Sequence, residues 1–246
     1  NTPLDFLVVA DHAAMIGVLR EMHTGTAEFE PMSVWGSIKR WFAKTMVIRA
    51  IDNDLGMEFF GKFLPVAASD PDADPVMDIN NKRKPSPFGD LNPIKATAWH
   101  DIVDAAEQHN EPGKFSALIG WEWTSMPTGA NLHRVVFTPD GSDKAKQFLP
   151  FGTDQSQYPE DLWQWLDQTS KKTKARFVAI PHNSNISKGF MFAETNLNGR
   201  PITQQYARTR MQWEPVVEVT QFKGDSETRS AISPDDEFAE FEKFDH

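Results

Sequence analysis

Four side chains of metal-binding type lie beside apolar runs of strand length. Two histidines and an acid follow such runs, and a third histidine stands near the beginning of one: His12, His182, Glu122 and His133. Neutral imidazole nitrogens and carboxylates are ligands of zinc, manganese and iron, and one carboxylate can bridge two ions that activate water between them. The set therefore has the chemistry of a metal centre.

The apolar runs and the helical patterns between them predict the elements that position these side chains. Strands are expected at 5–10, 115–121, 131–138, 176–180 and 215–220, and helices at 13–22, 94–109, 159–172 and 201–211. Strands that alternate with helices favour βα units around a parallel sheet, whose reactive residues collect at the carboxyl ends of the strands. His12, Glu122 and His182 should then converge, whereas His133 lies near the start of its strand and is not placed by this rule.

Each of these residues also has a structural interpretation. A single histidine at a strand end is more often a hydrogen-bonded or surface residue than a ligand. Glu122 stands between Trp121 and Trp123, an apolar setting in which a carboxylate needs a metal, several donors or a salt bridge with Lys or Arg. The other histidines are interpreted as solvent-facing: His23, His100, His109 and His246.

The segment 24–92 has no strand pattern and is expected to be an insertion. Helices are predicted near 33–44 and 45–63, and the proline-rich stretch 67–92 is typical of a loop or a lid. An aromatic stripe in the first helix is expected to pack against the protein rather than to stack on a ligand: Trp35, Trp41 and Phe42.

The composition bounds the class of protein. Of 246 residues, 39% are apolar and 24% charged, which is typical of one globular domain, and the net charge of −10 disfavours nucleic acid as a partner. No run of residues is long and apolar enough to span a membrane. The absence of cysteine excludes disulfides and thiolate ligands and leaves cytoplasm and periplasm both open. Phosphate-binding loops and serine-hydrolase elbows are also missing.

Several short motifs resemble those of a known group of enzymes. The stretches 6–12, 119–123, 131–134 and 180–183 are similar, in this order, to motifs of the PHP (polymerase and histidinol phosphatase) superfamily of metal-dependent hydrolases. The nearest resemblance is to the bacterial domain of unknown function 3604, which also has a string like Val219-Thr-Gln-Phe-Lys-Gly-Asp-Ser-Glu227.

This resemblance implies a fold and a set of roles. The fold is an α/β domain over 1–246 in which parallel βα units form a distorted (β/α)7 TIM-like barrel that holds two or three divalent ions. His12 matches a metal-binding histidine, Glu122 the bridging and catalytic carboxylate, and His133 and His182 the ligands of a second ion. Asp11 and Asn183 would orient these ligands.

The chain also lacks two motifs of the PHP pattern. Neither a His-x-His pair on the first strand nor a closing Gly-Ser-Asp-x-His motif occurs. The resemblance therefore implies an incomplete barrel, an internal fragment truncated at both ends. Unpaired strand edges would favour a homo-oligomer.

The function expected from these residues is metal-dependent hydrolysis of a small anionic or ester substrate, in the bacterial cytoplasm or periplasm. A phosphoester is favoured, and Arg134 and Lys223 are candidate groups for binding an anion. For Arg134, a surface position on the opposite face of the strand is the favoured alternative. Three alternatives stay open: hydrolysis of a carbamate or another ester, a module that binds metal without catalysis, and unrelated polar groups in an α/β domain.

Overall fold

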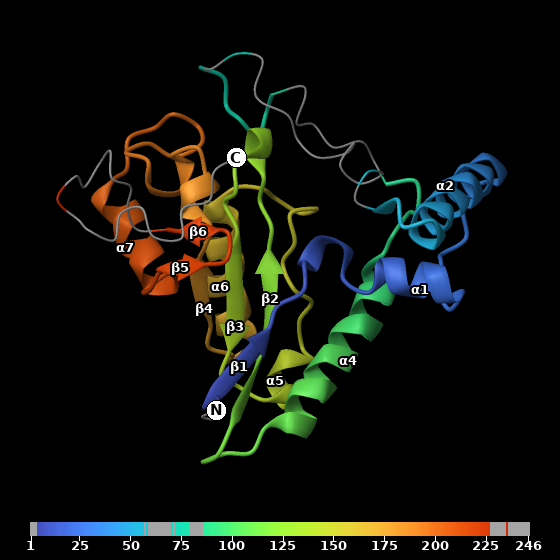
Figure 1. Ribbon diagram of the computed structural model, residues 1–246, viewed down its shortest axis with the longest axis horizontal. Helices are drawn as coiled ribbons and strands as arrows, with labels where there is room; N and C mark the ends of the chain where they lie inside the picture. Colours follow the sequence, from blue (N-terminus) through green and yellow to red (C-terminus); the bar gives the residue numbers. More distant parts are fainter. Residues whose placement is uncertain are drawn as a thin grey trace.

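The computed structural model describes residues 4–56, 58, 70, 72–78, 86–226 and 235. In this part of the chain, a four-stranded sheet carries helices on one face, and a group of helices stands to its side (Figure 1). The strands are β1 (Phe6–Val9), β2 (Ser116–Trp123), β3 (Arg134–Thr138) and β4 (Val178–Pro181), and β5 (Thr220–Gln221) pairs with β6 (Gly224–Asp225) in a separate hairpin. The helices are α1 (Val18–Thr24), α2 (Val34–Asp52), α4 (Asn92–His109), α5 (Ser142–Ala145), α6 (Pro159–Thr173) and α7 (Gln204–Trp213).

The large sheet is mixed and open. In the order β1-β2-β3-β4, β1 and β2 are parallel, and β3 runs antiparallel to both of its neighbours. The expected parallel βα units of an incomplete, distorted (β/α)7 TIM-like barrel are therefore wrong. The physical reason is the connection 124–133, which contains only the 3-10 turn Pro127–Gly129. A parallel crossover needs a longer connection, usually with a helix, so the chain turns back instead.

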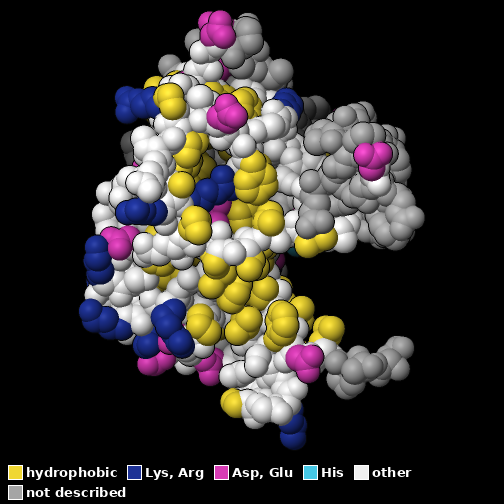
Figure 2. Space-filling view, turned by 90° about the vertical axis from the view of Figure 1, so that its left-hand side faces the viewer, with side chains coloured by type: hydrophobic (Ala, Val, Ile, Leu, Met, Phe, Trp, Pro, Cys, Tyr) yellow, Lys and Arg dark blue, Asp and Glu magenta, His cyan; other side chains and the backbone are white. Residues whose placement is uncertain are grey.

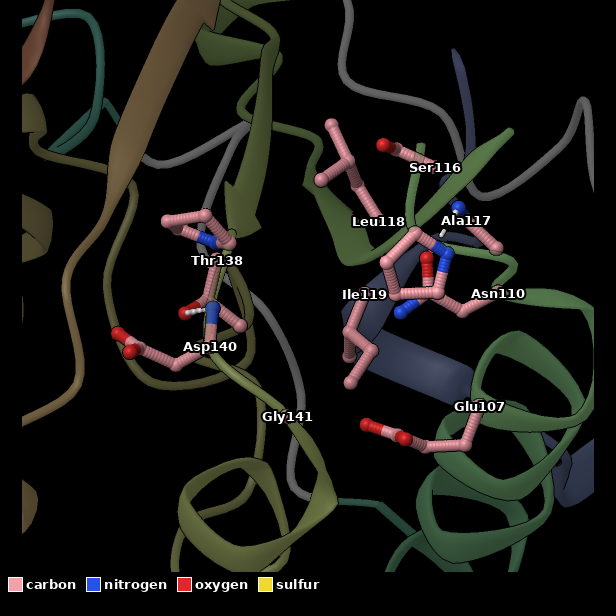
Figure 3. A pocket seen from close by; sticks show the side chains of 11 residues that line it. Glu107, Asn110, Ser116, Ala117, Leu118, Ile119, Thr138, Asp140 and Gly141 are labelled. Atoms are coloured by element: carbon pink, nitrogen blue, oxygen red, sulfur yellow. Dashed lines mark hydrogen bonds between the residues drawn. The ribbon is translucent and has the colours of Figure 1, made fainter. Parts of the chain in front are cut away.

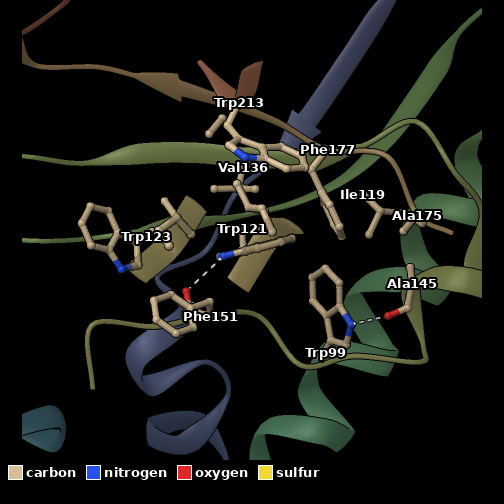
Figure 4. Packing of buried hydrophobic residues seen from close by; sticks show 14 of the residues in the cluster. Trp99, Ile119, Trp121, Trp123, Val136, Ala145, Phe151, Ala175, Phe177 and Trp213 are labelled. Carbon is tan, nitrogen blue, oxygen red and sulfur yellow. Dashed lines mark hydrogen bonds between the residues drawn. The ribbon is translucent and has the colours of Figure 1, made fainter. Parts of the chain in front are cut away.

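Tryptophans dominate the core between the sheet and its helices (Figure 4). Trp121 and Trp123 point from β2 toward α4 and α6, where they meet Trp99 and Trp163. The buried indole nitrogens have acceptors: Trp99 Nε1 donates to the carbonyl of Ala145 at 2.9 Å, and Trp121 Nε1 donates to that of Phe151 at 3.2 Å. Alternation along β2 then sends Glu122 to the opposite face.

Helix boundaries follow local sequence signals, as the patterns predict. Pro93 and Pro159 stand in the first turns of α4 and α6, where a missing N–H costs nothing. Thr203 begins α7 by accepting a hydrogen bond from Tyr206 N. The predicted helix 13–22 is interrupted, because Gly17 adopts a left-handed φ of 69° and separates the 3-10 turn Ala13–Met15 from α1.

The predicted strand 215–220 does not form, since only Thr220 belongs to β5. The preceding residues are extended but make few backbone contacts with the sheet, among them Glu218 N to the carbonyl of Pro181 at 3.0 Å. Figure 2 views the side that carries α7 in Figure 1 and shows apolar side chains gathered over its middle. The exposed apolar residues of α7 and the stretch after it are Met211, Val216, Val217, Val219 and Phe222.

Two further expectations about burial are wrong. The continuous apolar run 6–10 is typical of a strand buried on both faces, yet β1 is an edge strand and Phe6 is 64% exposed. The aromatic stripe was expected to pack, yet Trp35 and Trp41 are 74% and 67% exposed. They belong to α2, which is one continuous helix where two were predicted, and which packs on α1 through its other side.

The insertion 24–92 is described only in part. Its helix α2 shares a separate apolar cluster with α1 and the start of α4, built around Val18, Met22, Val47 and Ile94. Part of the expected lid 67–92, namely 67–69, 71 and 79–85, lies outside the described residues, as do the end of the helix expected to reach 63 and the acidic residues 236–245. Of the described helices, none has the length and apolar character needed to cross a membrane.

Candidate metal centre

Strand direction brings the four predicted ligands to one edge of the sheet. β1, β2 and β4 run the same way, and His12, Glu122 and His182 lie at or just beyond their carboxyl ends. Because β3 runs the opposite way, its first residues reach this same edge, and His133 immediately precedes it. The strand reversal that overturns the predicted fold is therefore what places His133 in the cluster.

Glu122 is the centre of this cluster. Its Oε1 lies 2.8 Å from Nδ1 of His133 and 3.4 Å from Nε2 of His182. Its Oε2 faces the other way, 3.4 Å from Nδ1 of His12. One ligand atom from each of Glu122, His133 and His182 lies within 4.8 Å of the other two. The carboxylate thus divides its two oxygens between three imidazoles.

Buried polar atoms of the cluster lack hydrogen-bond partners. They are Glu122 Oε1, His133 Nε2 and His182 Nδ1. Although Oε1 is close to His133, the contact does not have hydrogen-bond geometry. Buried polar atoms without partners cost free energy, so several in one place indicate a shared ligand. Carboxylate and imidazole lone pairs are what a divalent cation accepts, and the residues therefore fit a metal ion.

The protonation states agree with this fit. Burial by itself would raise the pKa of Glu122, but the imidazoles of His133 and His182 outweigh burial and hold that pKa well below its usual range. Burial lowers the pKa of His133, and the opposing effect of Glu122 offsets it only in part. An ionised carboxylate beside a neutral imidazole is the pair that a metal ion requires, because a protonated ring has no free lone pair.

His12 and Asp11 occupy the outer side of the cluster. The side chain of His12 is 64% exposed, and its Nδ1 also hydrogen bonds to the hydroxyl of Thr124. Asp11 is exposed and contributes through its backbone, since Glu122 N donates to its carbonyl at 2.8 Å. This main-chain bond fixes the end of β2 against the end of β1.

Asn183 and Glu218 hold the turn that follows His182. Asn183 is fully buried in a left-handed conformation, with φ of 59°, and neither atom of its side-chain amide has a hydrogen-bond partner. Its backbone N–H donates to Oε2 of Glu218 at 2.8 Å, and Ser226 Oγ donates to the same oxygen at 2.9 Å. Glu218 therefore positions His182 indirectly. The spacing of residues did not indicate this role, because Glu218 lies within the predicted strand 215–220, which does not form.

The group expected to bind an anion at this edge is engaged elsewhere. Arg134 points to the tryptophan face of β3, where it is buried and its Nε donates to Glu214 Oε1 at 2.9 Å. The prediction that Arg134 binds an anionic substrate and the alternative that it lies at the surface are both wrong. Lys223 lies in the turn between β5 and β6, with Nζ 5.6 Å from the ring centroid of Phe222. The described histidines assigned to solvent are exposed as predicted: His23, His100 and His109.

A second polar hollow opens at the opposite edge of the sheet and has a different character (Figure 3). Its volume is about 240 Å³. No histidine lines it, and its carboxylates already have donors: Glu107 accepts from Ser142 N, and Asp140 accepts from Lys144 and Arg176. The histidine cluster is therefore the candidate site.

Comparison with known proteins gives one result. Residues 1–246 match the family described as Protein of unknown function (DUF3604). No curated protein and no solved structure matches the chain. The resemblance to this family, expected from the sequence, is confirmed, whereas the wider resemblance to the PHP superfamily rests on the sequence motifs alone.

Proposed function

The chain belongs to the family described as Protein of unknown function (DUF3604), and from the cluster at its sheet edge we propose that it is a metal-dependent hydrolase of phosphoesters. Glu122, His133 and His182 would hold a divalent ion. The exposed His12 would complete the set from the outer side. Zinc, manganese and iron suit these ligands, and two or three ions are the number that the PHP resemblance implies.

One observation carries this proposal: a largely buried carboxylate and two imidazoles converge, and each contributes a buried atom that has no hydrogen-bond partner. A purely structural cluster would be expected to satisfy its buried atoms internally. The division of Glu122 between His12 on one oxygen and two histidines on the other also suits a carboxylate that bridges two ions.

The chemistry that a bound divalent cation supplies is Lewis acidity, which lowers the pKa of water and polarises the bond to be broken. The chain's own residues divide the remaining work. Glu122, whose pKa is held low, stays ionised and acts as a ligand rather than as an acid. His12 is the exposed member and is the one that reaches a substrate approaching from solvent.

A carboxyl ester or carbamate is the second candidate substrate. The observation that favours it is the burial of Arg134 against Glu214, which removes a cation that would attract a phosphate group. The phosphoester stays first because the motif resemblance is to phosphatases and because a metal centre can itself neutralise a phosphoryl oxygen.

The test is to assay the 246-residue chain, first stripped with a chelator and then loaded with Mn²⁺ or Zn²⁺. The substrates are p-nitrophenyl phosphate, bis(p-nitrophenyl) phosphate and p-nitrophenyl acetate. We expect metal-dependent release of nitrophenol from a phosphate substrate, and a loss of about 100-fold or more in kcat/KM for Glu122→Gln. The matched control is Glu111→Gln, which changes an exposed acid paired only with Lys114 and should leave turnover unchanged.

The outcomes separate the candidates. Turnover of p-nitrophenyl acetate alone would contradict the phosphoester as the substrate class and favour a carboxyl ester. Tight metal binding without turnover of any substrate would contradict the proposed hydrolase activity and identify a module that binds metal without catalysis. An absence of metal binding by elemental analysis would contradict both.

A further inference from the structure

Helix α2 has two apolar sides, and in the described part of the chain only one of them packs against other elements. Its inner side packs on α1 through Val47 and Ala50. Its outer side points away from the sheet at the periphery of the molecule (Figure 1). The exposed apolar residues on that outer side are Val34, Trp35, Ile38, Trp41, Phe42 and Met46.

The spacing of these residues makes one continuous stripe. On a helix that turns about 100° per residue, positions 34, 38 and 41 and positions 35, 38 and 42 each follow one line along the axis. The stripe lies opposite Val47 and Ala50, which fall on the buried side. Exposed apolar patches of this kind, with two tryptophans, mark an interaction surface rather than ordinary surface variation.

The charge of α2 is opposite to that of the chain. The helix carries Lys39, Arg40, Lys44 and Arg49 against one acid, Asp52, whereas the whole chain has a net charge of −10. Lys39 and Lys44 fall on the two borders of the stripe by the helical period. Arg40 and Lys44 stand 5.1 and 5.9 Å from the ring centroid of Phe29, a side chain that packs against the inner cluster, so these two cations lie on the flank of α2 between the stripe and the protein.

We propose that the outer side of α2 docks onto an anionic lipid surface. The helix would lie in the plane of the interface, with its tryptophans among the headgroups and its lysines on lipid phosphates. Aromatic and aliphatic residues on one side, bordered by Lys and Arg, are the composition of helices that lie on membranes, and tryptophan prefers the interface between hydrocarbon and water. Crossing the bilayer is not required, and none of the described helices could do so.

A second copy of the chain fits this surface less well. Two α2 helices facing each other would bring together eight cations and only two acids, counting four and one from each, and like charges at an interface are unfavourable. Anionic lipid headgroups complement the cations, while the apolar stripe enters the headgroup region. Charge thus selects the lipid surface over self-association.

The experiment is flotation of the 246-residue chain with vesicles of phosphatidylcholine, with or without phosphatidylglycerol. We expect binding to the anionic vesicles, weaker binding to the neutral ones and release as salt is raised. The double variant Trp35→Ser with Trp41→Ser should lose binding by at least about tenfold. Lys39→Gln with Lys44→Gln should lower affinity for the anionic vesicles by about tenfold or more and change binding to neutral vesicles little.

The matched control changes two exposed apolar residues elsewhere, Met211→Ser with Phe222→Ser, which are 72% and 88% exposed and should leave flotation unchanged. Light scattering of each protein is recorded in parallel. A chain that floats with neither vesicle overturns the proposal, as does equal loss of binding in the control. A dimer that the tryptophan variant dissociates, without flotation, overturns it in favour of a second copy. The salt dependence of the unmodified chain tests the electrostatic part without any substitution.

Discussion

Two buried carboxylates on opposite sides of the sheet have been given different partners. Glu214, on the tryptophan side, accepts hydrogen bonds from Arg134 Nε at 2.9 Å and Trp163 Nε1 at 2.7 Å on one oxygen, and from Arg210 Nε at 2.9 Å on the other. Glu122, at the sheet edge, meets imidazoles and keeps a buried oxygen without a hydrogen-bond partner.

The two carboxylates are served by consecutive residues of one strand. Arg134 is the first residue of β3, and His133 immediately precedes it. Because side chains alternate along an extended chain, the two residues point to opposite faces of the sheet. Permanent cations and an indole N–H satisfy Glu214 completely, so this network is structural. Imidazoles can be neutral and can exchange a proton for a metal ion, so the Glu122 cluster can accept a ligand. The two carboxylates therefore differ in the chemistry of their partners: Glu214 has permanent donors on both oxygens, whereas Glu122 faces imidazoles that also offer lone pairs to a metal ion.

The largest effect on stability should come from breaking the Glu214 network. Arg134→Met would remove one of the two cations that hold the buried Glu214 carboxylate, and the free energy of unfolding should fall by ~3–5 kcal/mol. Urea denaturation of the metal-free protein measures it. The control is Arg176→Met, which removes a 71% exposed arginine from Asp140 and should cost about 1 kcal/mol or less. Equal losses in the two variants would show that the buried network is not special.

The next effect concerns ligand-dependent stability at Glu122. At a free Mn²⁺ or Zn²⁺ concentration of 100 times Kd, the unmodified chain should gain about 2.7 kcal/mol in the free energy of unfolding. Glu122→Gln should retain less than about 1 kcal/mol of that gain, because the amide is a poorer metal ligand than the carboxylate. Arg134→Met, if folded, should keep the full gain. Thermal unfolding with and without chelator provides the measurement, and a gain that survives in Glu122→Gln would remove this residue from the site.

The smallest effect is a pH dependence of the metal-free protein. Burial holds the pKa of His133 below its ordinary value of 6.5 in the folded state, so the unfolded chain takes up a proton at higher pH than the folded chain does. Stability from this residue is therefore present above about pH 6.5 and lost as the pH falls below it. Glu122 remains ionised over this range because its pKa is held far lower. Urea denaturation between about pH 7.5 and 5.5 should show a shallower slope for His133→Gln, whereas parallel curves would contradict the prediction.

Residue chemistry alone was enough to find the members of the candidate site. His12, Glu122 and His182 follow apolar runs, and each lies within three residues of the end of a described strand. His133 could not be placed, because periodicity reports which face a side chain takes but not the direction of a strand. The length of the segment 124–133 could have revealed the reversal, since so short a connection favours an antiparallel return.

Burial was the least predictable property. Val-rich β1 and the aromatic stripe of α2 have the composition of core elements, yet both are exposed among the described residues. An apolar pattern shows that a surface gains free energy by leaving water, but it does not specify what covers that surface. In α2 the inner side is covered by α1, and the outer side is covered by no described element. No local sequence rule tells these two sides apart.

The sequence by itself determined which side chains can bind a metal and where most strands and helices lie, because ligand chemistry and hydrophobic period are local properties. Tertiary structure alone decided that β3 is antiparallel to its neighbours. As a result, His133 contacts Glu122 whereas Arg134 points to the other face of the sheet. It also decided that Glu218 binds the turn after His182. These outcomes depend on pairing between segments far apart in the chain. Such pairing is selected by the packing free energy of the whole sheet, to which every segment contributes.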